Sequence, residues 1–367
     1  MGCKTVQHCL NTTLHKENYM LSRHCLACSS RVFSGAEETA PVEAVSEDDS
    51  QEERDRKERI PQRKADISRC WSKYCMDVLR VSRDKCVQEM TSTEESDEDQ
   101  NIEKETSDED SACGGEGDEE GDRKEPLRFE SLEVTSLEQH VCCSWRAKSG
   151  SNISKEFYVL DGHVTNHVEI LQDMSQLYKL LSFFDEDFER RCKMHKRRVD
   201  MLSEVLIELN PQHYLLVCRQ LMFEIAESYS DMIDLKMSIA EESGGAPSMH
   251  AVKKINTLIN QSIKFFQSFS DSLKHKGALP EKFDEDTVRP ALVAQFYIAR
   301  LYSKLICADK YGKVENLKKS FDIYQYLVEY CDAHPDMPEK AFKDELGVSR
   351  EMARLLPLKM DKIMSEP

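Results

Sequence analysis

Apolar residues recur at helical spacing along about 40 residues in the middle of the chain. From residue 168 to residue 209 most of them step by three or four, which places their side chains on one face of an α-helix, and Arg191, His195 and Arg198 interrupt this stripe. Asn210 and Pro211 end this stretch, because the residue before a proline avoids the helical region and proline suits the first turn of a new helix. The pattern predicts one long helix with the apolar positions Met174, Leu177, Leu181, Phe184, Phe188, Val199, Leu202, Val205 and Leu209.

Further helices are predicted downstream, where glycine and proline mark the breaks between periodic stretches. No alternating run bounded by turn residues competes with them, so the predicted fold class is all-α. The predicted helices cover residues 211–242, 249–273, 289–309, 314–333 and 338–356.

Two of these helices share the pattern F-x-I-A-x-x-Y, at residues 223–229 and 296–302. The helices that follow them also match, with Ser-Ile-Lys-Phe-Phe-Gln at 262–267 and Ser-Phe-Asp-Ile-Tyr-Gln at 320–325. A small alanine between two aromatic side chains lets a neighbouring helix approach closely. This packing is typical of tetratricopeptide-like solenoids of helical hairpins, in which each pair buries its face against its neighbours. The copies lie 73 residues apart, against a standard period of about 34, so long and degenerate repeats are predicted.

Composition divides the rest of the chain into predicted segments. Two segments are rich in charge, and the longer of them has too little apolar surface to fold. The segments are a partial helical repeat (1–36), a charged linker (37–61), a helix of the solenoid (62–90), a disordered acidic tract (91–126), an uncertain junction (127–156), a long helix with a basic segment (157–210) and C-terminal tetratricopeptide-like repeats (211–360).

The formal net charge of −18 belongs mainly to the two charged segments. Residues 92–122 hold fifteen acidic side chains and one lysine, and residues 37–59 hold ten acidic and four basic ones. The residues predicted to fold are therefore nearly neutral, and the total charge says little about their binding surface. An acidic chain binds nucleic acid or anionic membranes poorly, and no run reaches the roughly 18 apolar residues of a membrane span. We expect a soluble, cytoplasmic protein without nucleic-acid binding or membrane insertion.

The sequence contains none of the motifs that commonly indicate catalysis, such as a phosphate-binding loop, a zinc-protease helix or a nucleophile elbow. We therefore expect no enzyme activity and no cofactor. Cys25-x-x-Cys28 lacks the second ligand pair of a zinc site, and the fourteen cysteines are expected to be reduced, structural thiols. Asp161, His163 and His167 lie near a glycine and are interpreted as a cap and turn rather than a metal site.

The strongest local charge lies in residues 190–198, which we call the basic segment. It fits three interpretations: a helix face paired with the acidic residues at 185–187 and 189, a contact surface for an acidic protein partner, or a nuclear import or nucleic-acid patch. The last is weakened by the absence of interleaved aromatic residues. The candidate partner-binding residues are Arg190, Arg191, Lys193, Lys196, Arg197 and Arg198.

Ser-Asp-Glu-Asp occurs twice in the acidic tract, beginning at Ser96 and at Ser107. A serine directly before acidic residues is the pattern that an acid-directed kinase prefers. A solvated spacer is the alternative interpretation, and phosphorylation at these two serines is the hypothesis.

Several strings of the sequence resemble the KIF-binding protein family, the kinesin-binding proteins of animals. The resemblance is dense from about residue 157 to residue 360, and weaker matches lie further upstream, around Arg23 and Arg69. The strings are too specific for a generic helix consensus and lie at residues 161–170, 189–198, 209–217, 252–256 and 289–291.

The resemblance implies a right-handed helical solenoid that binds the motor domains of a subset of kinesins and controls their engagement with microtubules. It implies a cytoplasmic, cytoskeleton-associated protein that supports axonal microtubule organisation and axon outgrowth. Members of the family carry a long N-terminal half without a counterpart here, so the resemblance implies a truncated form. The alternative is a general tetratricopeptide-type scaffold, or a co-chaperone-like adaptor, that binds peptide segments.

Overall fold

The chain is all-α, as predicted. The computed structural model describes residues 22–31, 50–97, 137–242, 244, 247–275, 277–335 and 342–365. Within these ranges there is no strand, apart from an isolated bridge between His275 and Ala278. No helix in the described part of the chain combines the length and the apolar character that crossing a bilayer requires.

The chain divides into two compact units, and the boundary follows Ile170 inside one helix. The first unit contains a helical segment at 22–31, α3 (Gln51–Asp97), α4 (Leu137–Phe157) and the start of α5 (Val164–Phe183). The second contains the rest of α5, then α6 (Phe188–Glu208), α7 (Pro211–Glu242), α8 (Met249–Ser272), α9 (Glu285–Lys304), α10 (Lys310–Ala333) and α11 (Lys343–Ser365).

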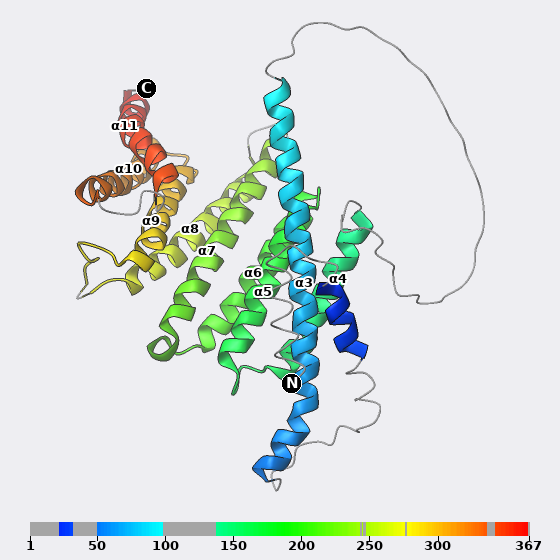
Figure 1. Ribbon diagram of the computed structural model, residues 1–367. Helices are drawn as coiled ribbons and strands as arrows, with labels where there is room; N and C mark the ends of the chain where they lie inside the picture. The colour runs from blue at the N-terminus through cyan, green and yellow to red at the C-terminus, as the bar shows by residue number, and fades with distance from the viewer. Residues whose placement is uncertain are drawn as a thin grey trace, which may run out of the picture. The chain divides into compact units, whose positions relative to one another are not determined.

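The second unit is a helical solenoid. From α6 to α11 each helix packs against the next one along the chain, and Figure 1 shows α6, α7 and α8 side by side. Contacts between helices that are not consecutive are few. A core that is shared only between neighbours is the defining property of this architecture.

The predicted repeat is confirmed by a hydrogen bond that occurs in both copies. Ser262 of α8 donates its hydroxyl to the backbone oxygen of Ala226 on α7, at 2.8 Å. Ser320 of α10 donates in the same way to Ala299 on α9, at 2.7 Å. All four residues are fully buried, so the small side chains bring each pair of backbones together.

Aromatic rings fill the flanks of these close contacts in both copies. The ring of Phe266 meets the ring of Phe223 edge to face, with 5.3 Å between the centroids. Tyr324 meets Phe296 in the equivalent way, at 5.8 Å. Edge-to-face pairs add stabilisation beyond the apolar area that they bury.

Helix α3 begins earlier than the sequence predicted, inside the expected charged linker. Ser50 and Glu53 form a capping box, in which the Glu53 carboxylate accepts from the Ser50 amide at 3.0 Å and the Ser50 hydroxyl accepts from the Glu53 amide. This pairing satisfies free amides of the first turn. The helix also continues through Pro61, where the sequence predicted a boundary.

Helix α4 occupies most of the region that the sequence left as an uncertain junction. Its contact with α3 uses small residues in place of large apolar ones. Ser154 donates to the backbone oxygen of Ala65 at 2.7 Å, and Ser72 of α3 donates to that of Ala147 at 2.8 Å. Such a face shows no apolar stripe, which is why hydrophobic periodicity did not reveal it.

The single long helix predicted for residues 168–209 is wrong, because the structure contains two helices there. α5 ends at Phe183, and α6 begins after Asp187, whose carboxylate accepts hydrogen bonds from the amides of Glu189 and Arg190. An aspartate in this position stabilises a helix start. The predicted bounds of two further helices also differ from the structure. α9 begins at Glu285 and not at residue 289, and α11 spans residues 343–365 and not 338–356.

The α3–α4 contact yields a test of close packing. A Cβ atom added at Gly150 would lie 2.4 Å from the backbone oxygen of Ser68 and 2.5 Å from the hydroxyl of Ser72. We expect Gly150→Ala to lower the free energy of unfolding by about 1–3 kcal/mol through overpacking, as measured by urea denaturation followed by circular dichroism.

Gly347→Ala in α11 is the matched control, since an added Cβ there meets no atom within 4 Å. Alanine favours a helix by up to about 1 kcal/mol over glycine, so this variant should be as stable as the parent or more so. Equal stability of the two variants would contradict the close approach of α3 and α4.

Candidate partner-binding surface

The basic segment lies on α6, and its six candidate residues have different environments. Arg190, Lys193, Lys196 and Arg197 are exposed, Arg191 is half-buried and Arg198 is fully buried. Arg198 therefore does not lie on a surface that a partner could contact. The other five remain candidates.

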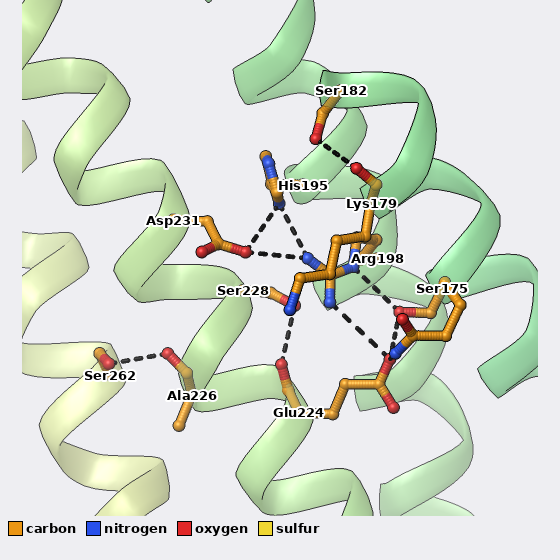
Figure 2. A network of polar contacts seen from close by, with 11 residues as sticks. Ser175, Lys179, Ser182, His195, Arg198, Glu224, Ala226, Ser228, Asp231 and Ser262 are labelled. Atoms are coloured by element: carbon orange, nitrogen blue, oxygen red, sulfur yellow. Dashed lines mark hydrogen bonds and ion pairs between the residues drawn. The ribbon is translucent and has the colours of Figure 1, made fainter. Parts of the chain in front are cut away.

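Arg198 joins three helices from inside the second unit. Its Nε donates to the hydroxyl of Ser175 on α5 at 3.0 Å, and its Nη1 donates to Nδ1 of His195 at 2.9 Å and to the carboxylate of Asp231 on α7 at 3.1 Å. Nη2 lies 3.8 Å from Oε1 of Glu224, also on α7. Figure 2 shows these side chains converging on the guanidinium from α5, α6 and α7.

The buried charge of Arg198 is matched by two carboxylates, which reduces the cost of removing it from water. Ser175 connects them, because its hydroxyl accepts from Arg198 and donates to Glu224. Burial still raises the pKa of Asp231, although Arg198 acts in the opposite direction. Breaking one partner of a buried pair usually costs about 3–5 kcal/mol, because it leaves an uncompensated charge. The network therefore holds α6 in a defined position against α5 and α7.

The sequence contained a signal for this network. Arg191, His195 and Arg198 interrupt the apolar stripe of the predicted helix, and polar residues at core positions need buried partners. The partners Ser175, Glu224 and Asp231 were not predicted, because they lie on other helices and share no motif with α6.

The exposed part of the basic segment is partly paired within the chain. Arg190 binds both carboxylate oxygens of Asp185, at 2.9 to 3.1 Å, which confirms the predicted pairing with the preceding acidic residues. Glu189 pairs instead with Lys236 of α7, at 2.5 Å. Lys196 forms an ion pair with Asp200 one turn further along α6. Three charged residues of this face, Arg190, Glu189 and Lys196, are therefore already paired within the chain.

Lys193 and Arg197 are the cations of this face that remain available. The Arg197 guanidinium lies 5.8 Å from the centroid of the Tyr178 ring, and neither residue has a carboxylate at ion-pair distance in the described part of the chain. They lie one turn apart on α6 and are both exposed. We refer to Lys193 and Arg197 as the free cation pair.

Helix α7 also presents a row of carboxylates, Glu227, Asp231 and Asp234, to a cavity of about 110 Å³. Lys304 of α9 pairs with Asp234, and burial raises the pKa of Glu227. The cavity is therefore a mixed-charge site and not a simple acidic one. The cavity is also lined by Lys179 of α5 and by Tyr297 and Arg300 of α9.

The two histidines named among the sequence candidates lie beside a turn and contact neighbouring residues. His167 contacts the backbone oxygen of Tyr158 through Nδ1 at 2.7 Å, and His163 stacks on Phe157 beside a turn at Gly162, where φ is +94°. The described residues contain no group of three or more side chains that could hold a metal ion. Ser96 belongs to the last turn of α3, and Ser107 lies outside the described residues.

His195 makes the network sensitive to pH. Burial, followed by the positive charges of Arg198, Lys179 and Arg191, lowers the pKa of His195 to about 3 from 6.5. Below pH 6.5 His195 binds a proton in the unfolded chain but stays neutral in the folded chain. This residue therefore lowers the free energy of unfolding as the pH falls from 6.5 towards 3. At pH 5 the loss is about 2 kcal/mol relative to pH 7.5.

We expect His195→Asn to remove this loss, because the amide oxygen can accept from Arg198 but does not take up a proton in this range. Urea denaturation of both proteins at pH 7.5 and pH 5 measures the difference. The raised pKa values of Asp231 and Glu227 act with the opposite sign in both proteins and cancel in the comparison. An identical pH dependence in parent and variant would refute the buried, neutral state of His195.

Comparison with known proteins identifies the family. The family described as "KIF-1 binding protein C terminal" matches residues 13–363, including the stretch that the sequence left as an uncertain junction. The "KIF-binding protein" of Xenopus tropicalis is 42% identical over 95% of this chain, and that of Gallus gallus is 41% identical over 96%. The "KIF-binding protein" of Drosophila melanogaster is 28% identical over 93%.

The matched region is part of a longer sequence in each of these relatives. It covers 58% of the Xenopus tropicalis protein, 60% of the Gallus gallus protein and 56% of the Drosophila melanogaster protein. The chain thus spans a little under two thirds of their length. From the match over residues 13–363, the chain belongs to the KIF-binding protein family.

Proposed function

We propose that this chain binds kinesin motor domains and, without catalysing a reaction, controls their engagement with microtubules. The observation that carries the proposal is family membership, because the relatives are named for binding KIF proteins. In this proposal the chain acts on microtubules only indirectly, through the kinesin motor domain that it binds. The proposal extends to a cytoplasmic, cytoskeleton-associated role in axonal microtubule organisation and axon outgrowth.

The architecture supports this proposal physically. A solenoid of helical pairs presents an extended surface suited to a folded protein partner. The basic segment has a defined position on that surface, because the buried Arg198 side chain bonds α6 to α5 and to α7. The free cation pair can then meet acidic side chains of a partner without breaking an ion pair of this chain.

A pull-down with a panel of purified kinesin motor domains tests the proposal. The Xenopus tropicalis relative, run in parallel, is the positive control. We expect at least one motor domain to bind this chain and its pelleting with microtubules to fall when the chain is added. The proposal fails if the relative retains motors that this chain does not, or if the chain itself pellets with microtubules.

Charge reversal of the free cation pair tests which surface is used. We expect Lys193→Glu/Arg197→Glu to weaken motor binding about tenfold at low salt, with the difference shrinking at about 0.5 M salt as the charges are screened. Affinities measured by interferometry at both salt concentrations check this.

Lys264→Glu/Lys318→Glu is the matched control, with the same change in net charge at exposed lysines of α8 and α10. This variant should bind like the parent. Equal weakening by the two variants would show that net charge, and not the surface of α6, governs binding.

The alternative function is a general scaffold that binds peptide segments at the mixed-charge cavity lined by α5, α7 and α9. Its cavity of about 110 Å³ has room for the end of one side chain. Binding of unrelated peptides with affinities similar to those of motor domains would favour this alternative.

A further inference from the structure

The contact between α3 and α4 follows a regular antiparallel register. Residue 65 faces residue 154, residue 68 faces residue 150, and residue 72 faces residue 147, as the two serine-to-carbonyl bonds and the close approach at Gly150 show. Each step moves three or four residues forward on α3 and three or four residues back on α4. This is the spacing of a helix–helix seam.

The next step of the seam places two cysteines opposite each other. Three residues beyond Ser72 lies Cys75, and four residues before Ala147 lies Cys143. Both side chains are buried, with exposed fractions of 2% and 6%. Their thiols are in hydrogen-bond contact, and this contact lowers the pKa of Cys143, as do the nearby charges of Arg146 and Arg23, against the effect of burial.

The backbones of α3 and α4 approach closely along the seam, which is what a disulfide between them requires. A disulfide needs Cα atoms about 4.4–6.8 Å apart, which is shorter than the usual 8–10 Å between the axes of packed helices. Alanine, serine and glycine at the three preceding steps remove the side-chain bulk that normally keeps helices apart. The hydroxyl-to-carbonyl distances of 2.7 and 2.8 Å across the seam record this close approach.

Cys70, another cysteine of this unit, differs in a way that matters for reactivity. Cys70 lies on the same helix and is also buried, but burial raises the pKa of its thiol to about 11. A thiol must lose its proton to act as a nucleophile. Cys70 therefore serves as an internal reference for a buried, unreactive cysteine.

We propose that Cys75 and Cys143 form a reversible disulfide when the protein meets a peroxide, and that this bond covalently joins α3 to α4. In the first step the Cys143 thiolate attacks one oxygen of hydrogen peroxide. The O–O bond breaks, a sulfenic acid forms, and the departing hydroxide is protonated to water. In the second step the Cys75 thiol attacks the sulfenic sulfur, the S–O bond breaks, and a second water leaves. Overall, two thiols and one peroxide give one disulfide and two waters.

Peptide mapping of the folded, reduced chain tests the proposal. The protein is treated with hydrogen peroxide, alkylated, and measured by intact mass before proteolysis. We expect the oxidised protein to carry two alkyl groups fewer than the reduced protein, and to yield a peptide that links Cys75 to Cys143, at least about tenfold more abundant than any other linked pair. Dithiothreitol should reverse both changes, and oxidation in urea should abolish the preference.

Three variants locate the chemistry. With Cys75→Ser, the sulfenic acid on Cys143 should persist and be trapped by dimedone, whereas Cys143→Ser should leave Cys75 reduced. Cys70→Ser should form the link as the parent does. The proposal is overturned if a different pair dominates in the folded parent. It is also overturned if the folded parent forms no linked peptide under peroxide treatment that oxidises its thiols in urea. Both outcomes are read from the parent, so they hold even if a variant fails to fold.

Discussion

Buried serine hydroxyls that donate to alanine carbonyls on a neighbouring helix set the spacing on which this structure depends. The bond occurs between α7 and α8, between α9 and α10, and twice between α3 and α4. A helical carbonyl has a second lone pair, so it can accept this bond and keep its place in the helix. Only a small residue beside that carbonyl lets the serine approach, and the surrounding aromatic rings then complete the core.

The Arg198 network contributes more to the position of α6 than to the stability of the fold. A guanidinium with no exposure contributes little net stability, because desolvation offsets most of its attraction to the two carboxylates. Its bonds are directional, however, and they reach α5 and α7 at fixed positions. The network therefore determines where α6 lies, and with it the position of Lys193 and Arg197 on the surface.

Much of the fold could be predicted from the sequence where large apolar residues mark the helices. The bounds of α7 and α8 agree with the prediction to within one residue, and the repeated F-x-I-A-x-x-Y pattern identified the helices that share a packing mode. Prediction failed where small residues make the contact, as in α4, or where a local cap overrides the apolar stripe, as at Asp187. It also failed for Arg198, since a charged residue on a helix is usually exposed.

The sequence by itself determined the helical class, the repeat and the family, because these depend on periodicity and on residue identity along the chain. Tertiary structure alone decided which cations are available to a partner and which cysteines face each other. Exposure and thiol contact depend on residues from other helices, such as Asp231 beside Arg198 and Cys75 beside Cys143. Those partners are separated by 33 and by 68 positions, so no local pattern encodes them.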